Sequence, residues 1–221
     1  MKNQTNQRRN FLKKSSLLTA SMLTTTSLVA NANGFLPSES FPTSDNESLY
    51  IVGPMKGYSP QVGTLLSMMN MMRHWVVQSV EFLTQKQLDF QMDEESNSIG
   101  AMLYHLASTE RAYQMSTFGE YKANYAKTRK EWDEQWALAQ NLGSKARNKI
   151  KGHNIKYYLD ILKKVRDHTK KEFVKRDDQW LMEQIPRGFG GKPTNNYAMW
   201  FHVCEHESNH RGQIKLIKKR M

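Results

Sequence analysis

The sequence predicts an all-α fold, a four-helix bundle that follows a signal peptide and an irregular linker. Apolar residues recur at helical spacing in four long segments, and no segment alternates apolar and polar residues as a half-buried strand does. The chain has 221 residues, 38% of them hydrophobic and 24% charged, which suits one packed core better than two. We therefore expect a single domain, residues 59–221, with one core and one site.

The first 32 residues are typical of an export signal. Arg8 and Arg9 are followed by Phe-Leu-Lys, an uncharged run rich in Ser and Thr, and the small-residue pattern Ala-Asn-Ala at 30–32. This order resembles a twin-arginine signal peptide, and a basic disordered N-terminus is the alternative. The apolar run is too short and too polar for a stable membrane span. We predict a periplasmic or other extracytoplasmic protein whose mature chain begins near Asn33.

Positive charge is concentrated in two parts of the chain. The signal segment carries five basic residues and no acidic ones, so its removal lowers the formal net charge from +11 to +6. This weakens the case for a nucleic-acid partner, and we expect none. Most of the remaining excess lies between Lys145 and Arg176, where twelve basic residues accompany three acidic ones. A solvated helix face is favoured there over an anion-attracting surface.

Four helices can be placed in order after the linker of residues 33–58, which mixes Pro, Gly, Ser and Asn without a period. The first begins after Ser59, a plausible cap, with Pro60 at its first position. Its apolar positions are Leu65, Met68, Met69, Met72, Trp75, Val76, Val80 and Leu83. The methionines among them fit core packing better than a copper(I) site.

The second helix is expected from a cap at Ser96 or Ser98 to about Phe118, with Gly119 ending it. Residues 128–140 predict a short helix or an insertion, within a connection from 119 to 154 that is long for a simple bundle.

The third helix runs from near Asn154 to about Val174, and the fourth begins after Pro193 and Thr194. The glycine-rich stretch 187–193 lacks the strand that precedes a phosphate loop, so we interpret it as a flexible lead into the fourth helix.

Two histidines interrupt the apolar face of the fourth helix. At about 100° per residue, His206 and His210 lie near the middle of one face. The other members of that face are Met199, Val203, Ile214 and Ile217. Burying two imidazoles without a partner is costly, and a shared divalent ion such as zinc or nickel removes that cost. Hydrogen-bonded structural histidines are the alternative.

A metal site generally needs at least three protein ligands, so a third must come from elsewhere. His105 stands at the edge of the apolar face of the second helix, where a neighbouring helix can reach it. His202 is the alternative, although three ligands on successive turns of one straight helix diverge from a single ion. Gln213 and His202 are also candidates to hold ligand imidazoles by hydrogen bonds.

Two motifs together carry a family resemblance: SIGAMLYHLASTE at Ser98 to Glu110, and HVCEHESNHRGQI at His202 to Ile214. Over residues 60–221 the chain resembles the DinB-like family of metal-dependent enzymes. The resemblance implies a four-helix bundle, commonly a homodimer, in which one histidine of the second helix and two of the last bind a divalent ion. These correspond to His105, His206 and His210. Relatives include thiol-dependent transferases and isomerases.

The leading functional hypothesis is an exported metalloprotein, either a hydrolase or a thiol-dependent transferase, acting on a small molecule that can include a thiol. Its substrate and catalytic residues are not assigned. A non-enzymatic metal-binding or interaction bundle is the alternative. A zinc peptidase with Glu207 as general base is weaker, because only eleven residues follow His210 and position 216 is leucine. A di-iron site lacks its second Glu-x-x-His motif.

Two single residues also raise expectations. Cys204 is the only cysteine, so no intramolecular disulfide forms, and a small buried residue is its expected role. Gly212 lies within the fourth helix, where glycine is about 1 kcal/mol less favourable than alanine. Close approach of another helix, within the bundle or across a two-fold interface, would explain it, and a tolerated surface glycine is the alternative.

Overall fold

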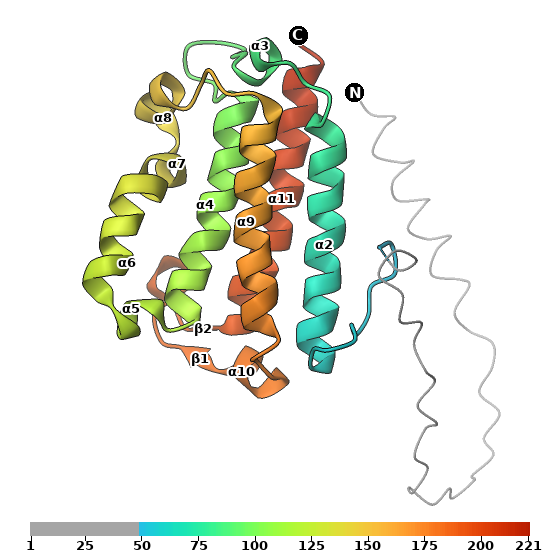
Figure 1. Ribbon diagram of the computed structural model, residues 1–221, viewed down its shortest axis with the longest axis vertical. Helices are drawn as coiled ribbons and strands as arrows, with labels where there is room; N and C mark the ends of the chain where they lie inside the picture. The colour runs from blue at the N-terminus through green and yellow to red at the C-terminus, as the bar shows by residue number, and fades with distance from the viewer. Residues whose placement is uncertain (1–48) are drawn as a thin grey trace, which may run out of the picture. The chain divides into compact units, whose positions relative to one another are not determined.

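A computed structural model describes residues 49–221, so the predicted signal and most of the linker lie outside the described residues. Four long helices form the bundle (Figure 1): α2 Pro60–Val80, α4 Ile99–Thr117, α9 Ile155–Phe173 and α11 Asn196–Lys218. Helix α11 packs against α2 and α4, and α9 packs against the other sides of the same two helices. The predicted all-α bundle is confirmed.

The directions of the helices explain the long connection after α4. In Figure 1, α2 and α11 run upward while α4 and α9 both run downward. Because α4 and α9 are parallel, the chain must return along the whole bundle, which for helices of this length is about 30 Å. It does so through a crossover segment, residues 120–149. The segment contains α5 Glu120–Ala123, α6 Tyr125–Glu131, the π-helix η1 Trp132–Trp136, α7 Ala137–Asn141 and α8 Gly143–Lys149.

Short elements close the ends of the bundle. Helix α3 Gln85–Leu88 lies between α2 and α4, and α10 Asp178–Met182 follows α9. Strand β1 Gln184–Ile185 pairs antiparallel with β2 Thr194–Asn195, and the 3-10 turn η2 Phe189–Gly191 lies between them. The glycine-rich stretch is therefore the loop of a small hairpin. The sequence did not reveal it, because two-residue strands are too short to show alternation.

Local capping fixes where the helices begin. The side chains of Ser98, Asn154 and Asn195 each accept a backbone N–H of the first turn of α4, α9 and α11. Helix α2 is different, and the expected cap by the Ser59 side chain is wrong. Ser59 donates its hydroxyl to Asp178 Oδ1, which also accepts the N–H groups at positions 61 and 62. An aspartate from α10 thus caps α2.

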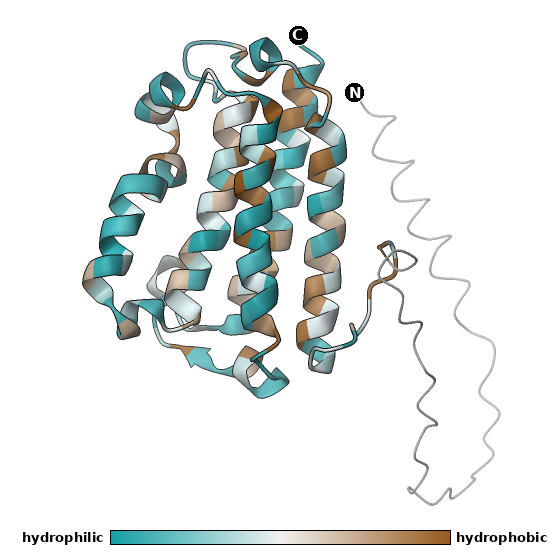
Figure 2. Ribbon diagram, in the orientation of Figure 1, coloured by the Kyte–Doolittle hydropathy of each residue, from teal (hydrophilic) through white to brown (hydrophobic). Residues whose placement is uncertain are grey.

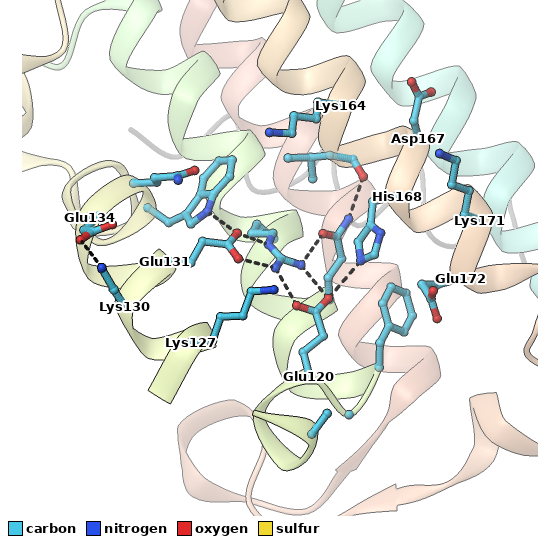
Figure 3. Close-up of a pocket in the computed structure, with 18 of the residues that line it drawn as sticks. Glu120, Lys127, Lys130, Glu131, Glu134, Lys164, Asp167, His168, Lys171 and Glu172 are labelled. Atoms are coloured by element: carbon cyan, nitrogen blue, oxygen red, sulfur yellow. Dashed lines mark hydrogen bonds and ion pairs between the residues drawn. The ribbon is translucent and has the colours of Figure 1, made fainter. Parts of the chain in front are cut away.

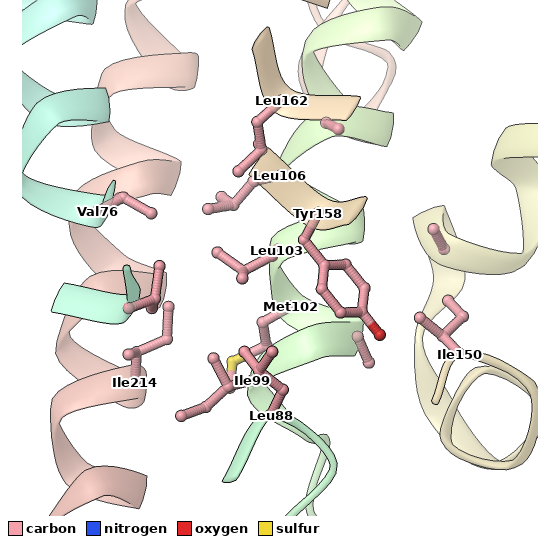
Figure 4. Close-up of a cluster of buried hydrophobic side chains, with 14 of the residues drawn as sticks. Val76, Leu88, Ile99, Met102, Leu103, Leu106, Ile150, Tyr158, Leu162 and Ile214 are labelled. Carbon is pink, nitrogen blue, oxygen red and sulfur yellow. The ribbon is translucent and has the colours of Figure 1, made fainter. Parts of the chain in front are cut away.

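The core lies along the inner faces of the four long helices. Figure 4 shows Val76, Leu103, Leu162 and Ile214 meeting from α2, α4, α9 and α11. Nearer the hairpin, a second cluster collects fully buried aromatic and aliphatic side chains: Leu65, Leu66, Met69, Phe173 and Trp200.

Three of the four methionines of α2 belong to this second cluster, and Met71 does not. Met69 is fully buried, and Met68 and Met72 pack against it while partly buried. The predicted packing role of these residues is confirmed.

Close helix contact in the core requires a glycine at one position. A Cβ on Gly100 of α4 would lie 2.6 Å from the hydroxyl oxygen of Tyr158 on α9. Gly212 has no such neighbour: it is exposed, and no described atom lies within 4 Å of a Cβ placed on it. Close approach within the bundle is therefore the wrong explanation for Gly212, and the dimer interface stays a prediction.

The outer surface is hydrophilic over much of α6 and the visible side of α9 (Figure 2), as expected for a solvated face. Among residues 49–221, no helix has both the length and the apolar character that crossing a bilayer requires.

Candidate metal centre

Helices α4 and α11 bring the three predicted histidines together. His105 lies on α4, and His206 and His210 lie one turn apart on α11. The Nε2 atoms of His105 and His206 are 2.8 Å apart, and the three rings have centroids 4.5 to 5.0 Å from one another. One nitrogen of each ring lies within 4.8 Å of the others, an arrangement compatible with a divalent ion.

The second ring nitrogen of two of these histidines is held by the protein. His105 Nδ1 lies 3.0 Å from the carbonyl oxygen of Ala139, and a carbonyl can only accept, so this nitrogen donates. His210 Nδ1 lies 2.9 Å from Gln213 Oε1 and donates in the same way. Both rings therefore present Nε2 to the group, and the predicted hydrogen bond between Gln213 and an imidazole of the group is present.

The three imidazoles are neutral at pH 7. Burial lowers the pKa of His105 to about 4, with the charge of His210 acting in the same direction. Burial also lowers the pKa of His206 to about 3, assisted by His210 and His105. The pKa of His210 is lowered as well, again chiefly by burial. Neutral imidazole is the form that binds a metal ion.

The three histidines differ in their exposure to solvent. His105 and His210 are each 7% exposed, whereas His206 is only partly buried. Thr109 Oγ1 lies 3.4 Å from His206 Nε2. His206 is therefore the most solvent-exposed member of the group.

His202 lies next to His206, one turn earlier on α11. Its ring centroid lies 5.1 Å from that of His206, and its Nδ1 forms a 2.7 Å hydrogen bond with the Tyr113 hydroxyl. Phe189 of the hairpin loop contacts the His202 ring, with centroids 5.1 Å apart. His202 thus supports Tyr113 and not a ligand imidazole. Sequence reasoning missed Tyr113 and Phe189, because neither position carries a pattern beyond an ordinary aromatic residue.

His202, Glu205 and His206 also have potential ligand atoms within 4.8 Å of one another. This second group shares His206 with the first and lies nearer the surface. The more buried group has His105 as its third member and does not include His202.

The three other histidines lie elsewhere. His74 contacts Tyr50, His153 stacks on Tyr157 at a centroid distance of 3.8 Å, and His168 Nε2 lies 3.0 Å from Glu120 Oε1.

A buried ion cluster lies beside the histidines, with one residue from each long helix: Arg73, Glu110, Arg166 and Glu207. Each arginine contacts both carboxylates at distances of 2.6 to 3.0 Å. Burial alone raises the pKa of Glu110, but the charges of Arg166 and Arg73 outweigh it and lower that pKa to about 2. The feature of the sequence that indicates this cluster is a charged residue on the apolar face of each long helix.

This cluster changes the interpretation of the His-Glu-x-x-His pattern. Glu207 is 1% exposed, and its Oε1 accepts hydrogen bonds from Arg73 and Arg166. A carboxylate held in the core by two arginines is not placed to act as the general base of a zinc peptidase. The glutamate of the motif contributes to the ion cluster.

Cys204 is buried, as expected, at 7% exposure. Burial and the nearby charge of Glu207 raise the pKa of its thiol to about 12. It is therefore protonated at neutral pH and unreactive.

The fold and the histidine group together define a four-helix bundle of the DinB-like class with a site compatible with a divalent ion. The chain belongs to the mycothiol-S-transferase family, whose model matches residues 64–221. That match covers the three histidines, α4, α9, α11 and all of α2 except its first four residues. No curated protein matches the chain.

Proposed function

We propose that this chain is an exported, metal-dependent transferase that joins a low-molecular-weight thiol to a small electrophilic molecule. The observation that carries the proposal is the convergence of three neutral imidazoles at a partly open position in a chain of the mycothiol-S-transferase family. Without the family match, the histidine group would support only the conclusion that the protein can bind a metal ion.

The donor set suits zinc or nickel. His105, His206 and His210 would hold the ion through Nε2, and Ala139 and Gln213 fix two of the rings from behind. A divalent ion bound there lowers the pKa of a coordinated thiol, which makes a nucleophile available at neutral pH.

The thiol must come from a small molecule. Cys204 is the only cysteine of the chain, and its buried, protonated sulfur is no nucleophile. Mycothiol, which the family name contains, is the first candidate, and other low-molecular-weight thiols fit the same chemistry.

Polar atoms near His206 and His202 can orient the substrate. Burial, and after it the charge of Glu205, raises the pKa of Tyr113 to about 12, so its hydroxyl keeps its proton at neutral pH. The hydroxyl is held in place by its hydrogen bond with His202 Nδ1. The Thr109 hydroxyl stands beside the ligand nitrogen of His206. Phe189 offers an apolar surface next to His202 for the body of an electrophile.

Hydrolysis is the weaker candidate for this site. In the zinc peptidases the glutamate of the His-Glu-x-x-His motif activates water, and here Glu207 is held by Arg73 and Arg166. A purely structural ion is also weaker, because His206 is partly exposed and structural sites are generally closed.

A conjugation assay tests the proposal. Purified protein loaded with zinc or with nickel is incubated with monochlorobimane and one thiol. Mycothiol, glutathione and cysteine are each tested in a separate reaction. The thiol sulfur bonds to carbon as chloride leaves, the thiol proton passes to solvent, and the fluorescent thioether is measured. We expect a metal-dependent rate with at least one thiol, lost in His206→Ala and kept in Cys204→Ala. A rate equal to that of buffer with every thiol, or its loss in Cys204→Ala, would contradict the proposal.

A further inference from the structure

A large groove lies between the crossover segment and α9, away from the histidines. Its volume is about 1020 Å³, and none of His105, His206 and His210 lines it. Figure 3 shows side chains of α6 on one side and of α9 on the other. The thiol-transferase proposal makes no use of this groove.

The floor of the groove is formed by a buried arginine, Arg111, whose guanidinium is hydrogen-bonded to neighbouring side chains of the protein. Arg111 is 9% exposed and forms paired contacts of 2.6 to 3.0 Å with the carboxylates of Glu120 and Glu131. Its Nη1 also donates to Gln114 Oε1 at 3.1 Å. Since these contacts use the carboxylates as well as the guanidinium, the floor is fixed in place. One guanidinium facing two carboxylates leaves the floor with one net negative charge, so positive charge for a ligand must come from the rim.

Apolar side chains form part of the walls. Phe118, Trp136 and Val165 line the groove from α4, η1 and α9, and Trp136 is held by a hydrogen bond from Nε1 to Glu131 Oε1. The groove can therefore bury apolar atoms of a ligand as well as meet its charge.

Most acidic groups at the rim already have basic partners. Glu134 and Asp167 contact Lys130 and Lys163, which are themselves rim residues. Asp160 contacts Lys156, and Glu172 contacts basic residues of the turn after α9.

Three rim lysines remain without such partners: Lys127, Lys164 and Lys171. Their ammonium groups form no ion pair or hydrogen bond with any other group of residues 49–221. Figure 3 shows Lys127 extending into the groove from α6 and Lys164 extending from α9 toward the crossover segment. A ligand between them meets uncommitted positive charge from both sides.

We propose that this groove is a binding site for a small amphiphilic anion, a carboxylate or sulfonate carried on an apolar body. The free lysines meet the anion, and Phe118, Trp136 and Val165 cover the apolar part. The mixed lining excludes a simple inorganic anion as the best ligand, because phosphate leaves the apolar walls in contact with water. It also gives the basic stretch of the sequence a role beyond a solvated face.

The occupant would lie against the same segment that orients a ligand of the metal centre. The carbonyl oxygen of Trp136 accepts a hydrogen bond from Ser108, and Ala139 of the following helix holds His105. The binding proposal does not depend on this connection, and it stands whether or not the chain transfers thiols.

Calorimetric titration with 1-anilinonaphthalene-8-sulfonate tests the proposal. The groove variant is Lys127→Gln/Lys164→Gln/Lys171→Gln. The matched control is Lys56→Gln/Lys86→Gln/Lys151→Gln, which removes the same charge from exposed lysines outside the groove. We expect binding by the natural protein, an affinity about tenfold lower in the groove variant, and a change of less than about twofold in the control.

Two results would overturn the proposal. One is absence of binding by the natural protein. The other is an affinity in the groove variant equal to that of the control, which would place the probe elsewhere. Thermal unfolding of both triple variants shows that each is folded, and inorganic phosphate titrated in the same way should bind more weakly than the aromatic sulfonate.

Discussion

The Nδ1 atom of His105 donates a 3.0 Å hydrogen bond to the carbonyl oxygen of Ala139, so the crossover segment orients a residue of the metal centre. Ser108, one turn further along α4, strengthens the contact by donating to the Trp136 carbonyl oxygen at 3.0 Å. A segment that first serves to return the chain along the bundle thus also supports the site. The corresponding support of His210 comes from a side chain, Gln213, which can be replaced.

Replacing Gln213 by alanine should weaken metal binding without removing it. Gln213 Oε1 holds the Nδ1–H of His210, and loss of such a supporting hydrogen bond generally lowers metal affinity about tenfold to hundredfold. Competition with a chromogenic chelator measures the change. Asn209→Ala is the control, because Asn209 is exposed beside His210. Equal affinities in the two variants would show that the Gln213 contact does not support the site.

The buried ion cluster should be far more sensitive to substitution than a surface ion pair. Arg166→Met leaves two buried carboxylates with one arginine, and removing one partner of a buried pair costs about 3 to 5 kcal/mol. Lys156→Met breaks an exposed pair with Asp160 and should cost less than about 1 kcal/mol. Urea unfolding gives both values. A loss below about 1 kcal/mol in Arg166→Met would contradict the assigned role.

Glu110 should make stability depend on acid pH. Its pKa in the folded chain is about 2, below the ordinary 4.5, because the attraction of Arg166 and Arg73 outweighs burial. Folding therefore favours the ionised form. The resulting stabilisation, about 3 kcal/mol, is fully present above pH 4.5 and is lost as the pH falls toward 2.

Comparison with Glu110→Gln isolates that contribution. The free energy of unfolding is measured in urea from pH 7 to pH 3 for both proteins, and the difference between them should shrink as the pH falls below 4.5. A difference that stays constant over this range would show that Glu110 has an ordinary pKa in the folded chain.

Export depends on residues outside the described part of the chain. If Arg8 and Arg9 belong to a twin-arginine signal, their replacement by lysine should retain the protein in the cytoplasm, and fractionation with immunoblotting measures this. The control is the reverse substitution at two nearby positions: Lys13→Arg/Lys14→Arg should leave export intact. Export of the Arg8→Lys/Arg9→Lys protein at the natural level would exclude the signal.

The four long helices could be predicted because their apolar spacing and their caps are local properties. Ser98, one of the two candidate caps, does cap α4, and α9 begins directly after Asn154, near which it was expected to start. His206 and His210 share a face because they are one turn apart. His105 needed the family resemblance as well, since periodicity placed it only at the edge of a face.

The remaining features depend on how distant segments meet. The parallel direction of α4 and α9 cannot be deduced from either helix, so the reason for the long crossover was not accessible. The charges of Arg73 and Glu110 on apolar faces were visible, but only packing shows that they neutralise one another. Asp178 caps a helix that begins 118 positions earlier along the chain, at Pro60, which no local pattern indicates.

Metal analysis of the purified protein tests the central claim most directly. Zinc and nickel content is measured by mass spectrometry for the natural chain and for His105→Ala, His206→Ala, His210→Ala and His202→Ala. One ion per chain is expected in the natural protein and in His202→Ala, with most of the metal lost in each of the other three variants. Full occupancy in His105→Ala together with loss in His202→Ala would contradict the cross-helix site and place the ion in the group of His202, Glu205 and His206.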